Sequence, residues 1–186
     1  PVLRPFQGEA LECLSRQPSP MGMVVLGGVG HGKTGVGYLA PAVVRAKRPA
    51  LIIPPDMRGQ EASDRRWWSE HYHFPAPQVW SHSDLSSRRR QTALDDYAPD
   101  LIVVDECHAF TSLDRARTMQ LVRYVVANPS TRVILMSGTF TSSSVLEMIH
   151  LMELALRGRS PLPLDQGVAQ VWASVLDAHG DPDSTA

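Results

Sequence analysis

Long apolar runs, cysteine clusters and a strong net charge are all missing from this sequence of 186 residues. No stretch of about 18 consecutive apolar residues occurs, which excludes a transmembrane helix. We therefore expect no membrane among the partners of this protein. The two cysteines, Cys13 and Cys107, fit no zinc-binding or C-x-x-C spacing, so we expect buried thiols. Residues 1–6 lack the basic and then apolar pattern of a secretory signal, which predicts an intracellular protein of the cytoplasm, nucleoid or nucleus.

The composition is typical of one folded domain. Hydrophobic residues make up 43% of the chain and charged residues 20%, which excludes wholesale disorder. With 13 glycines and 15 prolines, the chain is neither fibrous nor of low complexity. The formal net charge is only −1, so any surface for nucleic acid must be local.

A proline-rich break divides the chain unequally. Two prolines in the segment 160–163 end the helix before them, because proline lacks an amide donor and restricts the residue that precedes it. Beyond His179 little remains that could be buried. We therefore expect one domain over residues 1–160, and over 161–186 a linker with one helix and a frayed tail.

Apolar runs of strand length alternate with segments of helix length. The runs are nearly continuous, as in strands buried on both faces of a parallel sheet. This alternation predicts an α/β fold, with an open, mostly parallel sheet and helices on both faces. Strands are expected at 23–26, 50–53, 78–80, 101–104 and 133–136, and helices at 6–16, 33–47, 57–72, 84–95, 114–127, 142–157 and 166–178.

A glycine-rich segment directly after the first strand fits the pattern G-x-x-x-x-G-K-[ST]. Backbone amides that turn inward around a phosphate need glycine-tolerant dihedrals, and the next helix presents its positive end to the anion. Lys33 would lie against the β- and γ-phosphates, and the Thr34 hydroxyl would ligate Mg²⁺. His31 has no chemical task of its own that we can identify. The expected nucleotide site comprises Gly27, Gly28, Val29, Gly30, His31, Gly32, Lys33 and Thr34.

Two acids follow the apolar run 101–104. Acids at the carboxyl end of a buried parallel strand lie where open α/β sheets bind ligands. Asp105 would hold Mg²⁺ through its water shell. Glu106 would accept a proton from the water that attacks the γ-phosphate, or would orient that water.

The segment Asp105-Glu106-Cys107-His108 resembles the D-E-x-H box of superfamily 2 helicases and translocases. Leu3-Arg4-Pro5-Phe6-Gln7 is similar to the L-R-P-Y-Q segment upstream of the phosphate loop in many such motors. The resemblance implies a RecA-like fold for about residues 1–160, ATP as the nucleotide, and Gln7 as the residue that reads the adenine edge. It also implies a coupling role for His108.

Two further segments are similar to the Swi/Snf-type branch of this superfamily. Residues 51–55 with Gln60 and Trp68 resemble motif Ia, which implies nucleic-acid contact near Pro54, Pro55 and Arg58. Ser137, Gly138 and Thr139 resemble motif III, which implies that they link the nucleotide state to the grip on nucleic acid. Departures from the branch pattern include His31 in the phosphate loop and Phe140 after motif III.

Such motors have two RecA-like lobes, and the second supplies an arginine finger. Too few residues follow Ala155 for another lobe. The resemblance therefore implies a first motor lobe that acts on DNA or RNA with a second lobe from a longer protein or a partner, and hydrolyses ATP weakly by itself. Other interpretations remain: another P-loop ATPase such as a packaging or restriction motor, or a nucleotide-dependent interaction module that does not hydrolyse.

Two basic segments are open to either of two interpretations. The run Ser86–Gln91 contains three consecutive arginines, and segment 65–68 joins two arginines to two tryptophans. Arginines contact phosphates and tryptophans stack on bases. A solvated helix face and ordinary core packing explain the same residues without any ligand.

Overall fold

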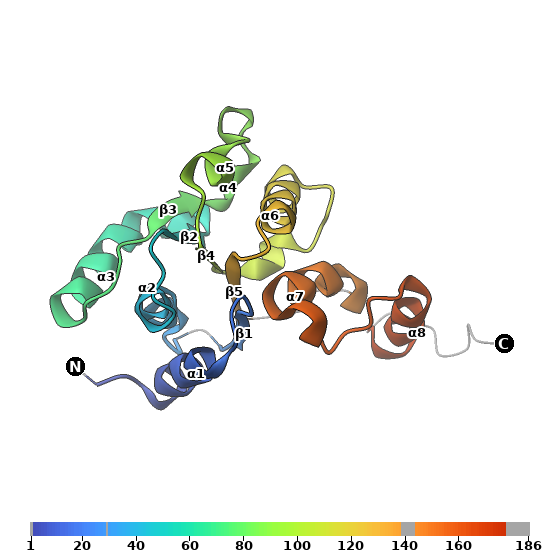
Figure 1. The fold of residues 1–186 in the computed structure, drawn as a ribbon, viewed down its shortest axis with the longest axis horizontal. Coiled ribbons are helices and arrows are strands. Elements are labelled where there is room, and N and C mark those ends of the chain that lie inside the picture. Colours follow the sequence, from blue (N-terminus) through green and yellow to red (C-terminus); the bar gives the residue numbers. More distant parts are fainter. Residues whose placement is uncertain (1, 29, 139–143, 178–186) are drawn as a thin grey trace.

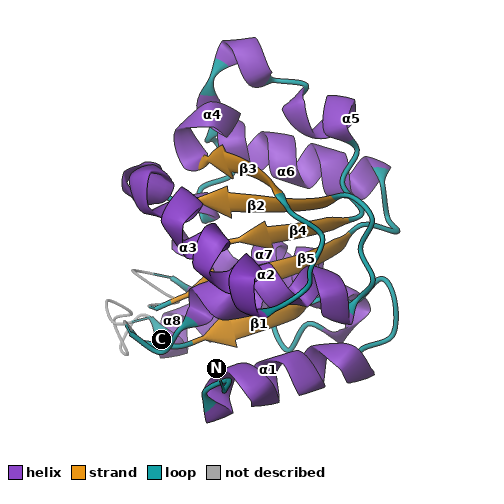
Figure 2. Cartoon of the chain, turned by 90° about the vertical axis from the view of Figure 1, so that its left-hand side faces the viewer, coloured by secondary structure: helices purple, strands orange, loops and turns teal. Residues whose placement is uncertain are grey.

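The computed structural model describes residues 2–28, 30–138 and 144–177. All five strands are parallel and form one sheet in the order β1-β5-β4-β2-β3, which confirms the α/β fold (Figures 1 and 2). Each strand coincides with an apolar run of the sequence to within one residue at either end. The strands are β1 (Met23–Leu26), β2 (Pro49–Ile53), β3 (Gln78–Ser81), β4 (Leu101–Val104) and β5 (Arg132–Ser137).

Helices cover both faces of this sheet. In Figure 1, α1, α2 and α3 lie on one side and α6 and α7 on the other. Single 3-10 turns occur between several of them. The α-helices are α1 (Pro5–Arg16), α2 (Lys33–Val43), α3 (Arg58–His71), α4 (His82–Ser86), α5 (Ala93–Tyr97), α6 (Ala116–Ala127), α7 (Ile149–Leu156) and α8 (Gln166–Leu176).

Alternate residues of the central strand β4 point to two separate cores. Ile102 and Val104 pack in a cluster with residues of α4 to α7, whereas Leu101 and Val103 pack with α1 and α2. All four side chains are essentially inaccessible to solvent. A strand buried on both faces needs apolar residues at every position, which explains its continuous apolar run.

Three of the predicted helices differ from the structure. The helix expected at 84–95 is broken into α4, a 3-10 turn at Arg88–Arg90, and α5, because Ser87 between the first two has extended backbone (φ −77°, ψ 131°). The helix expected at 33–47, with a kink near Pro41, ends at Val43, and Arg45 follows with a positive φ of 56°. The described part of the helix expected at 142–157 starts as a 3-10 turn at Val145–Met148 and continues as α7.

The cysteine prediction is half right. Cys107 is buried, but Cys13 is exposed on the outer face of α1. Among the described residues, none of the helices combines the length and the apolar character that crossing a membrane requires.

Helix α8, which follows α7, packs against the 3-10 turn Val145–Met148 that precedes α7. Ala169 and Ala173 are buried there, and Asp177 accepts a hydrogen bond from the backbone N–H of Val145 (2.8 Å). The expected frayed tail after His179 lies outside the described residues. The division into a lobe over 1–160 and a linker over 161–186 stays a prediction.

Candidate nucleotide site

The parallel sheet places the loops that follow all five strands on one edge. Strand order then sets the sequence of segments along this edge: the phosphate loop after β1, residues 137–138 at the end of β5, the acid pair after β4, residues 54–58 after β2, and residues 81–84 at the end of β3. In Figure 2 the strand arrows all point to this edge. Segments far apart in the chain therefore become neighbours at the place where open α/β sheets bind ligands.

The phosphate loop turns sharply into α2. Gly30 and Gly32 both have φ of +83°, a left-handed conformation that glycine adopts without steric cost. Gly32 is the residue before the first turn of α2, so the positive end of that helix faces the loop. His31 is exposed, and its ring meets that of Phe6 edge-on at 5.7 Å between centroids. Val29, a predicted ligand, lies outside the described residues.

Lys33 folds back under this loop. Its Nζ donates to the carbonyl oxygen of Gly27 (2.6 Å) and that of Gly28 (3.4 Å), and lies 3.9 Å from Oε1 of Glu106. The side chain is only 9% exposed. An ammonium group in this position can exchange its carbonyl partners for phosphate oxygens without a large movement of the chain.

Two side chains at the start of α1, those of Gln7 and of the preceding Arg4, hold the phosphate loop. Gln7 is 4% exposed; its Nε2 donates to the carbonyl oxygen of Gly32 (2.8 Å), and its Oε1 accepts from the backbone N–H of Arg4 (3.0 Å). Arg4 donates to the carbonyl oxygen of Gly30. The sequence analysis singled out Gln7 but missed Arg4. Its place three residues before the glutamine, at the start of a helix, was the available signal.

Thr34 and Asp105 line the same small cavity at this edge. Asp105 is 8% exposed, and its Oδ1 accepts from the backbone N–H of Glu106 (3.0 Å). Burial, together with the charge of Glu106, raises the pKa of Asp105 to about 6. A hydroxyl and a carboxylate oxygen suit Mg²⁺, which takes few protein ligands and keeps several waters. The donor set therefore fits the expected ion, although no group of three or more metal-binding side chains occurs among the described residues.

Glu106 is the centre of a polar cluster that spans β4 and β5. Its Oε2 accepts from Oγ of Ser137 (3.1 Å) and from the backbone N–H of Gly138 (3.4 Å). Nδ1 of His108 lies 3.2 Å from that same oxygen and 3.2 Å from Oγ of Ser137. Glu106 itself has a positive φ of 47°, an uncommon conformation for a side-chain-bearing residue. Thr139, the third predicted coupling residue of that segment, lies outside the described residues.

The predicted nucleic-acid residues lie apart from this cluster, beyond β2. Pro55 and Arg58 are exposed, and Pro54 is half-buried. His82, the first residue of α4 after β3, is a site residue that sequence reasoning missed. Its Nε2 donates to the carbonyl oxygen of Asp105 (2.9 Å), and burial lowers its pKa. No local pattern could have revealed this contact, because 23 positions separate the two residues.

A solved structure with a similar fold is the Sulfolobus solfataricus SWI2/SNF2 ATPase core in complex with dsDNA. The two folds align with a TM-score of 0.66 and 16% sequence identity, over 85% of this chain and 36% of that one. The fold is a RecA-like α/β fold. This chain spans little more than a third of that neighbour's length. No protein-family model and no curated protein matches the sequence.

Proposed function

We propose that this chain is the first, ATP-binding lobe of a nucleic-acid-dependent ATPase motor of the helicase or DNA-translocase type. The observation that carries the proposal is the meeting of Lys33, Glu106 and Ser137 in one polar cluster beside a glycine-rich loop. These residues come from three different strand ends. A structural neighbour with this fold is an ATPase core in complex with dsDNA, which favours a motor over other uses of a phosphate loop.

Each residue of the cluster would have a defined task. The backbone N–H groups of loop 27–33 and the Lys33 ammonium would bind the phosphates. Thr34 and Asp105 would hold Mg²⁺, which neutralises charge on the phosphates. Glu106 would take the proton of the attacking water or orient that water.

Coupling to nucleic acid would start from the hydrogen bonds of Glu106. Ser137 and His108 both contact this carboxylate, so a change at the γ-phosphate would alter their positions. Gly138 and Thr139 continue from there, and a DNA or RNA backbone would lie over Pro54, Pro55 and Arg58. A second RecA-like lobe would supply the arginine finger, which contributes about 10³–10⁵ in rate.

Calorimetry with Mg·ATP tests the nucleotide part of this proposal. The 186-residue chain should bind Mg·ATP, and Lys33→Ala should abolish most of the binding heat. The isolated chain should hydrolyse ATP very slowly, and more quickly once nucleic acid and a second lobe are added. An undetectable heat with wild type, or brisk single-turnover hydrolysis by the chain alone, would contradict the proposal.

A further inference from the structure

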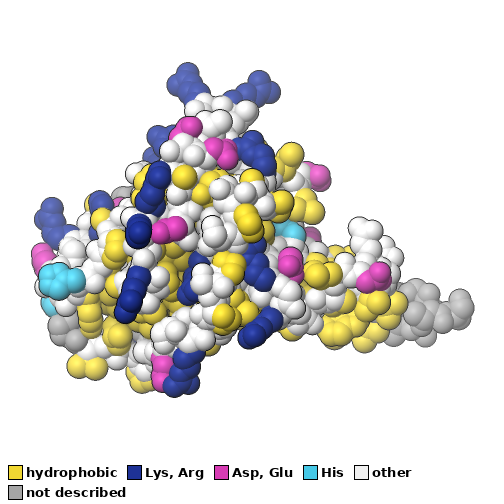
Figure 3. Space-filling model, viewed as in Figure 1, with side chains coloured by type: hydrophobic (Ala, Val, Ile, Leu, Met, Phe, Trp, Pro, Cys, Tyr) yellow, Lys and Arg dark blue, Asp and Glu magenta, His cyan; other side chains and the backbone are white. Residues whose placement is uncertain are grey.

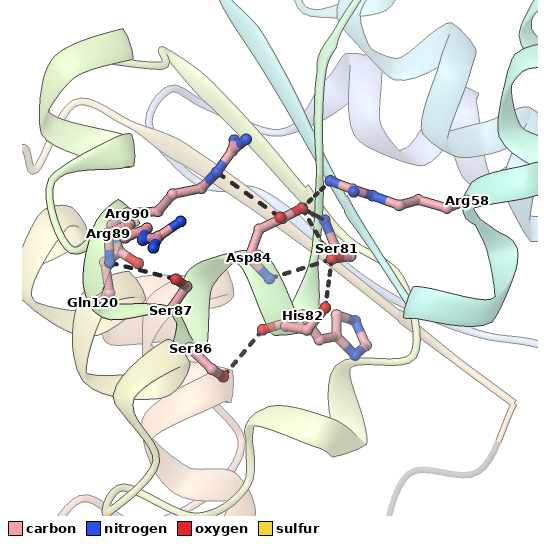
Figure 4. Close-up of polar contacts among 10 residues, drawn as sticks. Arg58, Ser81, His82, Asp84, Ser86, Ser87, Arg89, Arg90 and Gln120 are labelled. Carbon is pink, nitrogen blue, oxygen red and sulfur yellow. Dashed lines mark hydrogen bonds and ion pairs between the residues drawn. The ribbon is translucent and has the colours of Figure 1, made fainter.

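A second group of charged residues lies on the same edge of the sheet, beyond the nucleotide site. Asp84 of α4 forms an ion pair with Arg58, the first residue of α3, and its Oδ1 lies 3.9 Å from Nε of Arg90. Figure 4 shows the two arginines approaching this carboxylate from opposite sides. They belong to the segments that follow two adjacent strands, since Ile53 of β2 pairs with Ser81 of β3.

The carboxylate is fixed, whereas the arginines are open to solvent. Oδ2 of Asp84 accepts hydrogen bonds from the backbone N–H (2.8 Å) and Oγ (2.9 Å) of Ser81. Although burial opposes ionisation, these bonds and the charges of Arg58 and Arg90 hold the pKa of Asp84 below its usual range. The side chain of Asp84 is 15% exposed, against 52% for Arg58 and 49% for Arg90. An anion from solution can therefore reach both guanidinium groups.

More positive charge lies next to this pair. Arg88 and Arg89 are both exposed, and neither forms an ion pair with any residue in the described part of the chain. Figure 3 shows Lys and Arg side chains projecting from the end of the molecule that carries α4 and α5. A linear polyanion would meet several guanidinium groups there, with the partly buried carboxylate of Asp84 among them.

We propose that Arg58 and Arg90 grip a phosphodiester of the nucleic-acid backbone, and that Asp84 competes with it for both arginines and so limits the affinity. This inference rests on the proposed function, but Asp84 and Arg90 are new to it. A carboxylate and a phosphate present similar oxygen pairs to a guanidinium group, so binding of one weakens binding of the other. A motor must release its track in every cycle, and a built-in competitor favours release.

A hydrogen bond joins this site to the candidate nucleotide site. His82 lies two residues before Asp84, and it donates to the carbonyl oxygen of Asp105. Asp84 and His82 belong to the same short helix, α4. A phosphodiester that draws Arg58 and Arg90 away from Asp84 would therefore alter the contacts of the helix whose first residue, His82, is hydrogen-bonded to Asp105.

The test is fluorescence anisotropy of the 186-residue chain with labelled double-stranded and single-stranded oligonucleotides. Asp84→Asn keeps an oxygen that can accept from Ser81 but removes the charge. We expect it to bind about threefold to tenfold more tightly, with a salt dependence steeper by close to one released counterion. Asp95→Asn is the matched control, because it frees Arg123 from an exposed ion pair on α5, away from this edge.

A double-variant cycle separates competition from a general charge effect. In a chain that carries Arg58→Gln and Arg90→Gln, binding should be weaker, and Asp84→Asn should change it no more than Asp95→Asn does. Equal effects of Asp84→Asn and Asp95→Asn in the wild-type background, or weaker binding by Asp84→Asn, would overturn the inference while the proposed motor function stands. If neither wild type nor Asp84→Asn binds any oligonucleotide at low salt, the inference and the nucleic-acid part of the proposed function both fail. Calorimetry with Mg·ATP still reports on the nucleotide site in that case.

Discussion

The indole of Trp68 occupies the space that a β-carbon on Gly35 would need. An ideal Cβ at Gly35 would lie 2.3 Å from Cζ2 of Trp68 and 2.6 Å from Nε2 of Gln7. Gly35 is the third residue of α2, and a glycine there weakens the helix by itself. The close approach of α3 to α2 at the phosphate loop explains why the helix carries it.

Gly35→Ala is expected to destabilise the protein, because a methyl group at this position collides with Trp68. Overpacking of this kind costs about 1–3 kcal/mol, which exceeds the roughly 1 kcal/mol gained from the better helix propensity of alanine. Urea unfolding followed by circular dichroism measures the change.

Gly8→Ala is the matched control, because a Cβ on this glycine of α1 meets nothing within 4 Å. This variant should be as stable as wild type or more stable. Adding Trp68→Ala to Gly35→Ala should cost less than the sum of the two single changes. Equal stabilities of Gly35→Ala and Gly8→Ala would refute the steric explanation.

Gln7→Ala should weaken the binding of both ATP and GTP, because the Gln7 amide holds the carbonyl of Gly32 at the phosphate loop. If Gln7 also reads the adenine edge, as the family resemblance predicts, ATP should lose more affinity than GTP. Calorimetry with the two nucleotides measures the ratio. Unchanged affinities for both would show that the brace is dispensable.

Glu106→Gln is expected to bind Mg·ATP as well as wild type or up to about tenfold more tightly. The amide can still accept from Ser137 and Gly138, but it no longer repels phosphate charge or attracts Lys33. Hydrolysis should fall by about 10²-fold or more in the presence of a second lobe. Exposed Glu9→Gln serves as the control. Weaker nucleotide binding by Glu106→Gln would contradict this role.

Uptake of a proton by His150 should reduce the stability of the domain as the pH drops below about 6.5. Burial lowers the pKa of His150 from its ordinary value of 6.5, and Nε2 of this residue donates to the carbonyl oxygen of Phe110 (2.9 Å). The unfolded chain then binds the proton more readily than the folded one. The stabilisation that neutral His150 provides is therefore complete above pH 6.5 and is lost on acidification.

Urea midpoints at pH 7.5 and pH 5.5 test this dependence. His150→Gln can still donate to Phe110 but cannot take up a proton, so its midpoint should change less between the two pH values. Exposed His73→Gln should behave like wild type. The expectation is wrong if His150→Gln and wild type lose stability equally.

Local sequence patterns were sufficient to predict the strands but did not predict the break between α4 and α5 or the early end of α2. A strand buried on both faces is predicted by its own apolar residues, as in Leu101–Val104. The break between α4 and α5 is not, because Ser87 and the three arginines after it form a pattern that a solvated helix also tolerates. The early end of α2 depends similarly on Arg45, whose positive φ no pattern predicts.

The sequence by itself determined which residues lie at strand ends: the glycine-rich loop, the acid pair and residues 137–138 each follow an apolar run. The tertiary structure decided which strand ends are neighbours. The order β1-β5-β4-β2-β3 brings Glu106 to Ser137 and Lys33, and it brings Arg58 to Asp84. Strand order depends on how the connecting helices pack on the two faces of the sheet. This packing joins segments far apart in the chain, so no local spacing of residues encodes it.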